Sequence, residues 1–74
     1  MEQTTVYNYK QGNVEVSVHV NVAMTNGKAD AWVDYAMADG NELIASGRLT
    51  NEEYARMSEG GEHLLPERIY DWLA

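Results

Sequence analysis

The clearest pattern in the chain is an alternation of valines with polar residues. Five valines occupy every second position over one stretch: Val14, Val16, Val18, Val20 and Val22. β-Branched residues at a period of two are typical of a strand with one buried and one solvated face. In a helix, the same spacing would spread the valines around the circumference. We therefore predict a strand over residues 13–24, with its valines facing a core.

The dipeptide Asn26-Gly27 follows this strand and predicts a tight hairpin. Asn-Gly is the leading signal of a type I′ turn, because both central residues need a positive φ. The turn predicts a second strand over residues 28–38 and sets its register. The expected partners are Val22 with Ala31, Val20 with Val33, Val18 with Tyr35 and Val16 with Met37. A slip of one residue would move every partner to the other face, so the pairing is well specified.

A similar turn precedes the valine strand. A two-residue turn at Gln11-Gly12 predicts a strand over residues 4–10. The expected partners are Tyr9 with Val14, Tyr7 with Val16 and Thr5 with Val18. Both tyrosines then join the valine face as aromatic–β-branched pairs, which stabilise neighbouring strands.

The segment Asp39-Gly40-Asn41 predicts a third hairpin, leading into a strand over residues 42–49, but its register stays open. A two-residue loop would put Ile44, Ser46 and Arg48 on the core face. A three-residue loop with a bulge would put Leu43, Ala45, Gly47 and Leu49 there. We prefer the bulge because it buries no charge.

At Thr50 the pattern changes from strand to helix. The sequence Thr50-Asn51-Glu52-Glu53 is a capping box, and it predicts a short helix over residues 51–58 that ends at Gly60-Gly61. Pro66 near a first helical position opens a second helix with a compact apolar stripe. We expect an α+β fold over residues 1–74, a single domain. Its four-stranded antiparallel meander is followed by two C-terminal helices that pack on one face (ββββαα).

Charge and composition narrow the possible partners. The chain has 74 residues, with 12 acidic and 5 basic side chains and a net charge of −7. Binding to nucleic acid or to anionic lipid needs a cationic surface, so neither is expected, whereas a protein with a basic surface is a suitable partner. The chain has no cysteine and no apolar run that approaches a membrane span. Its first ten residues lack a signal pattern, and we expect a cytoplasmic protein.

Trp32 is the main candidate for a binding anchor. It alternates with Asp30 and Asp34, so the expected register points it away from the core, opposite Asn21. An exposed Trp offers a large rigid contact area at low entropic cost. Acidic and polar residues extend the predicted partner-binding set: Asp30, Asp34, His19, Glu15, Glu52, Glu53, Glu59 and Glu62.

The same sheet face carries residue types that occur in catalytic and metal sites. Ser17, His19 and Asp34 would share it, but side chains two apart on one strand lie roughly 7 Å from each other, beyond the reach of a hydrogen bond between Ser and His. Glu15, His19 and Asp34, with His63, make a thin ligand set for zinc. We expect no enzyme activity, no cofactor and no metal site.

In its small size, acidity and lack of cysteine, the chain resembles phage-encoded inhibitors, including anti-CRISPR proteins and DNA mimics. That resemblance implies a protein that occupies the basic, nucleic-acid-binding surface of a partner. The alternative is a homo-oligomer, in the simplest case a homodimer, built through an open edge strand over residues 4–10 or 42–49.

Overall fold

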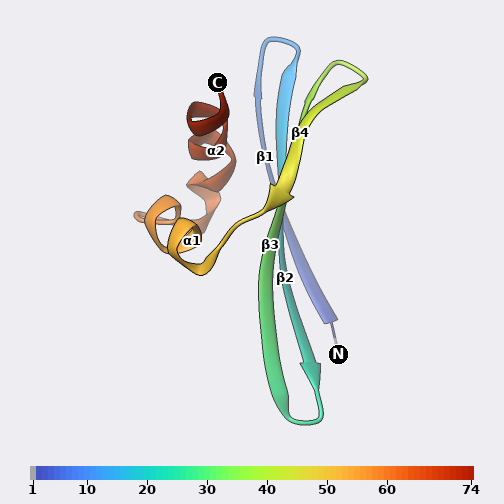
Figure 1. The fold of residues 1–74 in the computed structure, drawn as a ribbon, viewed down its shortest axis with the longest axis vertical. Helices are drawn as coiled ribbons and strands as arrows, with labels where there is room; N and C mark the ends of the chain where they lie inside the picture. Colours follow the sequence, from blue (N-terminus) through green and yellow to red (C-terminus); the bar gives the residue numbers. More distant parts are fainter. Residues whose placement is uncertain (1) are drawn as a thin grey trace.

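The computed structural model describes residues 2–74 as a four-stranded antiparallel sheet followed by two helices (Figure 1). The strands lie in chain order: β1 Glu2–Gln11, β2 Val14–Thr25, β3 Lys28–Asp39 and β4 Glu42–Arg48. The helices are α1 Asn51–Met57 and α2 Leu65–Leu73, with a 3₁₀ turn, η1 Glu62–Leu64, directly before α2. This is the predicted ββββαα arrangement. The strand ends differ from their expected bounds by at most two residues, and η1 was not predicted.

The β2–β3 hairpin has the predicted register. Val20 pairs with Val33 and Val18 with Tyr35, and both turn residues, Asn26 and Gly27, have positive φ (52° and 77°). That conformation is the one a type I′ turn requires. The valine row therefore faces the helices.

The predicted register of β1 is wrong by two residues. Tyr9 pairs with Val16 and Tyr7 with Val18, because the turn consists of Gly12 and Asn13 instead of Gln11 and Gly12. Gly12 takes the first turn position with a φ of 63°, as in a type II′ turn. A shift of two keeps the same side chains on the same face, so both tyrosines still join the valine face.

The β3–β4 hairpin combines features of the two alternatives. The loop is the two-residue turn Gly40-Asn41, since Asp39 pairs with Glu42, and the register shifts between Met37 and Ala38. After this bulge Ala45 and Gly47 lie on the core face, as predicted, and Leu49 is buried. Leu43 was predicted there too. It pairs instead with Ala38 on the outer face and is 62% exposed, because the bulge lies inside the strand and not in the loop.

The helices close a small core over the middle of the sheet. The buried apolar residues are Val16, Val18, Val33, Met37, Leu49, Met57, Leu65 and Ile69. The predicted capping box is present: the Glu53 amide donates to Thr50 Oγ1 (3.1 Å), and the Thr50 amide donates to Glu53 Oε1 (2.8 Å). Within residues 2–74 no helix has the length and apolar character needed to cross a membrane.

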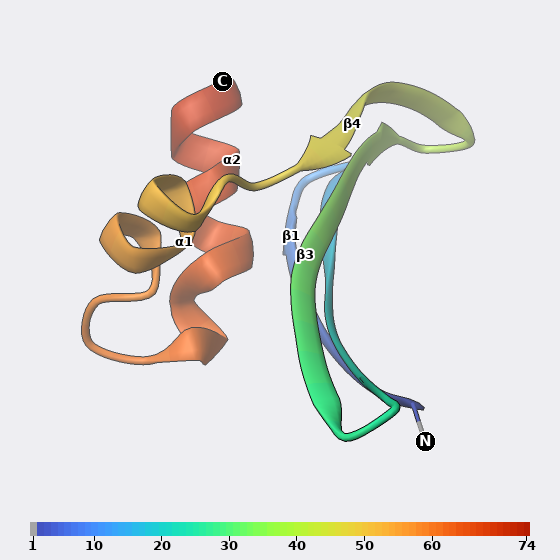
Figure 2. The same cartoon turned by 60° about the horizontal axis from the view of Figure 1, so that its bottom comes forward.

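The helical layer is shorter than the strands that it covers. Helices of seven and nine residues are roughly 10–14 Å long, whereas a twelve-residue strand spans roughly 40 Å. The turn end of the β2–β3 hairpin therefore projects past the helices (Figures 1 and 2). Val16 and Val18 are fully buried, but Val22, on the same face of the same strand, is 40% exposed. The valine face is thus only partly covered.

This partial cover predicts unequal costs for the same substitution. Val18→Ala should lower the free energy of unfolding by about 2 kcal/mol, because it removes two fully buried methyl groups. Val22→Ala should cost less than about 1 kcal/mol, because much of its side chain is already in water. Urea denaturation followed by circular dichroism measures both. Equal losses would contradict the observed limit of the helical layer.

Candidate partner-binding surface

A groove of about 640 Å³ opens where β4 leaves the sheet. β4 ends at Arg48, opposite Asp34, and the Leu49 amide then donates to the Val33 carbonyl (2.9 Å) as the chain crosses towards α1. Beyond that point β3 pairs with β2 alone, so its other edge and part of the valine face stay open. The volume lies within the range of small-ligand pockets.

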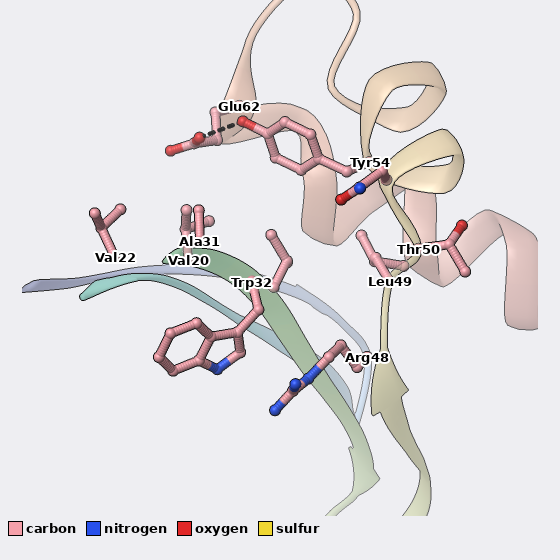
Figure 3. Close-up of a pocket in the computed structure, with 11 residues that line it drawn as sticks. Val20, Val22, Ala31, Trp32, Arg48, Leu49, Thr50, Tyr54 and Glu62 are labelled. Carbon is pink, nitrogen blue, oxygen red and sulfur yellow. Dashed lines mark hydrogen bonds between the residues drawn. The ribbon is translucent and has the colours of Figure 1, made fainter. Parts of the chain in front are cut away.

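The groove has an apolar floor and a polar wall. Val20, Val22 and Ala31 point from the sheet towards the side on which Tyr54 and Glu62 lie (Figure 3). Val33 and Leu49 complete the apolar surface, and Thr50 and Asn51 line the end next to α1.

Glu62 accepts two side-chain hydrogen bonds at the polar wall. Its two carboxylate oxygens accept hydrogen bonds from Tyr7 on β1 (2.8 Å) and from Tyr54 on α1 (2.6 Å). The bond to Glu62, followed by burial and the carboxylate's negative charge, raises the pKa of both tyrosines above 10.0. Glu62 was predicted to bind a partner. In the structure its carboxylate joins the sheet, α1 and η1, and its role in partner binding stays a prediction.

Trp32 lies at the rim of the groove, on the outer side of β3. It points away from the valines and towards Arg48, whose guanidinium carbon is 5.6 Å from the ring centroid (Figure 3). Arg48 Nε also donates to Asp34 (3.1 Å), and the side-chain Nδ2 of Asn21 donates to the same carboxylate (3.3 Å). Trp32 is therefore half-buried on a polar face, as its alternation predicted, but with a cation against its ring.

The other predicted residues of the outer face are close to Trp32 or farther along the sheet. His19 lies directly opposite Asp34, as expected, although that carboxylate bonds to Arg48 and Asn21. Asp30 is exposed and lines a shallow hollow with Trp32 and Arg48. Glu15 is also exposed, but it pairs with Lys10 and Ala38 near the opposite end of the hairpin.

The predicted acidic residues of the helical part lie on the other side of the sheet. Glu52 and Glu59 are exposed, whereas the Glu53 carboxylate is used in the capping box. The nearby Arg68 donates to the backbone carbonyls of Met57 and Glu59, which fixes its side chain against the loop after α1. The structure thus divides the predicted set into an outer-face group around Trp32 and a helical group.

Sequence reasoning missed Arg48, Tyr7 and Tyr54 as parts of this surface. Arg48 lies opposite Asp34 on the outer face only because the bulge shifts the register of β4. Tyr7 is 55 residues away from Glu62 in the chain, so no local pattern links them. The capping box predicted the helix that contains Tyr54, but not that the Tyr54 hydroxyl would contact the Glu62 carboxylate.

The outer face was also a candidate for catalysis or metal binding. The Ser17 hydroxyl donates to Asn8 (2.8 Å) on β1, and among residues 2–74 no group of three or more acidic or histidine side chains is arranged to hold a metal ion. Comparison of the chain with protein-family models, with curated proteins and with solved structures found no match.

The two tyrosine bonds to Glu62 predict a loss of stability at alkaline pH. Because the fold raises both tyrosine pKa values, their contribution is fully present below pH 10 and is lost as the pH rises through the raised values. Thermal unfolding followed from neutral pH to above pH 10 should show a steeper fall in Tm for the wild type than for the Tyr7→Phe/Tyr54→Phe variant. Parallel curves would show that these hydroxyls carry no pH-dependent stability.

Proposed function

We propose that this chain is a non-enzymatic binding protein that uses Trp32 and exposed carboxylates against a basic surface of a partner protein. In its most specific form, the partner's surface is one that otherwise binds nucleic acid, and the chain inhibits the partner by occupying it. The analogy is with the small acidic inhibitors that phages encode against defence proteins, including anti-CRISPR proteins. The encounter would take place in the cytoplasm, where such partners work.

The observation that carries this proposal is the lack of internal compensation for the negative charge. The chain has 12 acidic residues, yet among residues 2–74 the Arg48–Asp34 contact is the one ion pair. Arg68 donates to the backbone carbonyls of Met57 and Glu59 and not to a carboxylate. Exposed carboxylates remain on the helices at Glu52, Glu67 and Asp71, and in the loop after α1 at Glu59. An uncompensated surface of one sign attracts an oppositely charged partner and speeds association.

Trp32 supports the proposal as an anchor at the rim of the groove. A few residues carry most of the binding energy of a protein interface, and Trp is among the residue types enriched at those positions. The floor of the groove is apolar, and Asn51, which precedes the exposed Glu52 in the first turn of α1, lines the same groove. A basic partner could bring the apolar stem of a long cationic side chain into this groove and leave its charge near the carboxylates.

Capture experiments with matched variants test the proposal. The wild-type chain, fixed on a resin, is compared with Trp32→Ala and with Glu52→Lys/Glu59→Lys. A partner that uses this surface should bind at least about thirtyfold more weakly to Trp32→Ala, the loss expected for an interface anchor. It should also elute as salt rises from about 0.1 M to 1 M, which shortens the Debye length from about 10 Å to about 3 Å.

The control is Asp39→Lys/Glu42→Lys, which makes the same change of charge at the β3–β4 turn, away from the groove. It should retain the partner. Trp32→Ala should change the free energy of unfolding by no more than about 1 kcal/mol, because the ring contacts the exposed Arg48 through a cation–π interaction. Capture that is independent of salt, or equal on all four resins, would count against a charge-led interaction.

A further inference from the structure

The free edge of β1 lacks the features that usually protect an edge strand. β1 pairs with β2 over ten residues without a bulge, and residues 3–9 contain no charge, no proline and no glycine. Native edge strands are normally short, or carry a central charge, a proline or a bulge, because an open row of backbone groups templates further pairing. On the opposite side of the sheet β4 has such protection, because it is seven residues long and contains a bulge. The part of β3 that extends past β4 carries the charged residues Lys28 and Asp30.

The turn at Gly12 determines which backbone groups of β1 face that edge. In a two-residue hairpin the flanking residues, Gln11 and Val14, form a hydrogen-bonded pair, and such pairs alternate along the ladder. The odd-numbered residues of β1 therefore bond to β2. The even-numbered residues direct their N–H and C=O groups outward: Glu2, Thr4, Val6, Asn8 and Lys10.

The charges at the two ends of β1 favour one partner for its outward-facing backbone groups. Glu2 and Lys10 are both exposed, both on the outer face and equally distant from Val6. In an antiparallel pair of two copies centred on Val6, Glu2 of each copy lies opposite Lys10 of the other. A shift of two residues in either direction loses both charge pairs. We propose that a second copy of this chain pairs with β1 in this register and joins the two sheets into one.

The side chains between the charged ends suit the same register. Thr4 lies opposite Asn8 of the second copy, and Val6, 48% exposed in the single chain, packs against Val6 of the second copy. On the helical face Thr5 lies opposite Tyr7 and Gln3 opposite Tyr9. Opposite charges, aromatic residues and β-branched residues are the cross-strand pairs that stabilise a sheet.

The symmetry also improves the cover of the valine face. The two-fold axis of such a pair is perpendicular to the sheet, so both helical layers lie on one face. In each copy α2 lies over the Tyr9 end of β1, where the rings of Tyr9 and Tyr70 meet at 5.6 Å. That end lies opposite Gln3 of the other copy, whose neighbour on β2 is the half-exposed Val22. In the proposed dimer each helical layer would therefore lie beside the bare end of the other copy's sheet; the bare end of one sheet, at the β2–β3 turn, is visible in Figure 2.

Sedimentation equilibrium with the full chain tests this proposal. Across about a hundredfold range of concentration the wild type should change from a mass of 8.3 kDa to twice that mass, as mass action requires. Lys10→Glu places two like-charged pairs across the interface, and should weaken dimerisation roughly tenfold. Glu2→Lys/Lys10→Glu exchanges the charges and should restore it. Lys28→Glu makes the same change of charge at the β2–β3 turn and should leave the dimer with the affinity of the wild type.

A backbone variant tests the edge itself. Val6→Pro removes an N–H that faces outward, so the β1–β2 ladder keeps its bonds while the dimer should be lost. Circular dichroism checks that the variant folds. A wild type that stays monomeric throughout, a dimer that survives Val6→Pro, or a charge exchange that fails to restore association would each overturn the proposal. These outcomes are independent of whether Trp32 binds another protein.

Discussion

The conformation of two turn residues, Asn26 and Gly27, sets the face on which the side chains of β2 and β3 lie. Both have positive φ, so the turn contains only these two residues and Thr25 pairs directly with Lys28. The apolar residues of β2 and β3 therefore lie on the same side of the sheet. The turn at Gly12 places Tyr7 and Tyr9 of β1 on that same side. In β4, the residues after the bulge, Ala45 and Gly47, also lie there. The core and the position of Trp32 on the outer face depend on this shared side, whereas the turn at Gly12 determines which backbone groups of β1 face outward.

The attachment of the helices to the sheet relies on polar contacts as well as on burial. A chain of 74 residues without cysteine can bury only a small core, so each link between layers matters. Glu62 joins β1 and α1 through two tyrosine hydroxyls, and Arg68 joins α2 to the backbone after α1. Both charged groups are used inside the fold. The acidic character of the surface therefore comes from other residues, which include Glu15 and Asp30 on the strands and Glu52 and Glu67 on the helices.

Sequence reasoning succeeded where the signal was local. Alternation along β2, the Asn-Gly turn and the capping box each determine structure within a few residues, and all three are present as predicted. The β1 register was missed because a glycine can occupy either position of a tight turn, and both choices keep Tyr7 and Tyr9 on the same face. The candidate surface was only partly predictable. Trp32 follows from parity, whereas Arg48 depends on a bulge and Glu62 on contacts between distant segments.

The projecting end of the β2–β3 hairpin gives the molecule two regions of different rigidity. Over the core the strands are fixed by packed side chains, but near Asn26 they are joined mainly by their own ladder and by solvated side chains. Few buried apolar contacts oppose local opening there, so this end can change its twist or fray at a free energy far below that of global unfolding. The tip therefore behaves as a compliant arm that can adjust to a neighbouring surface while the helical end keeps its shape.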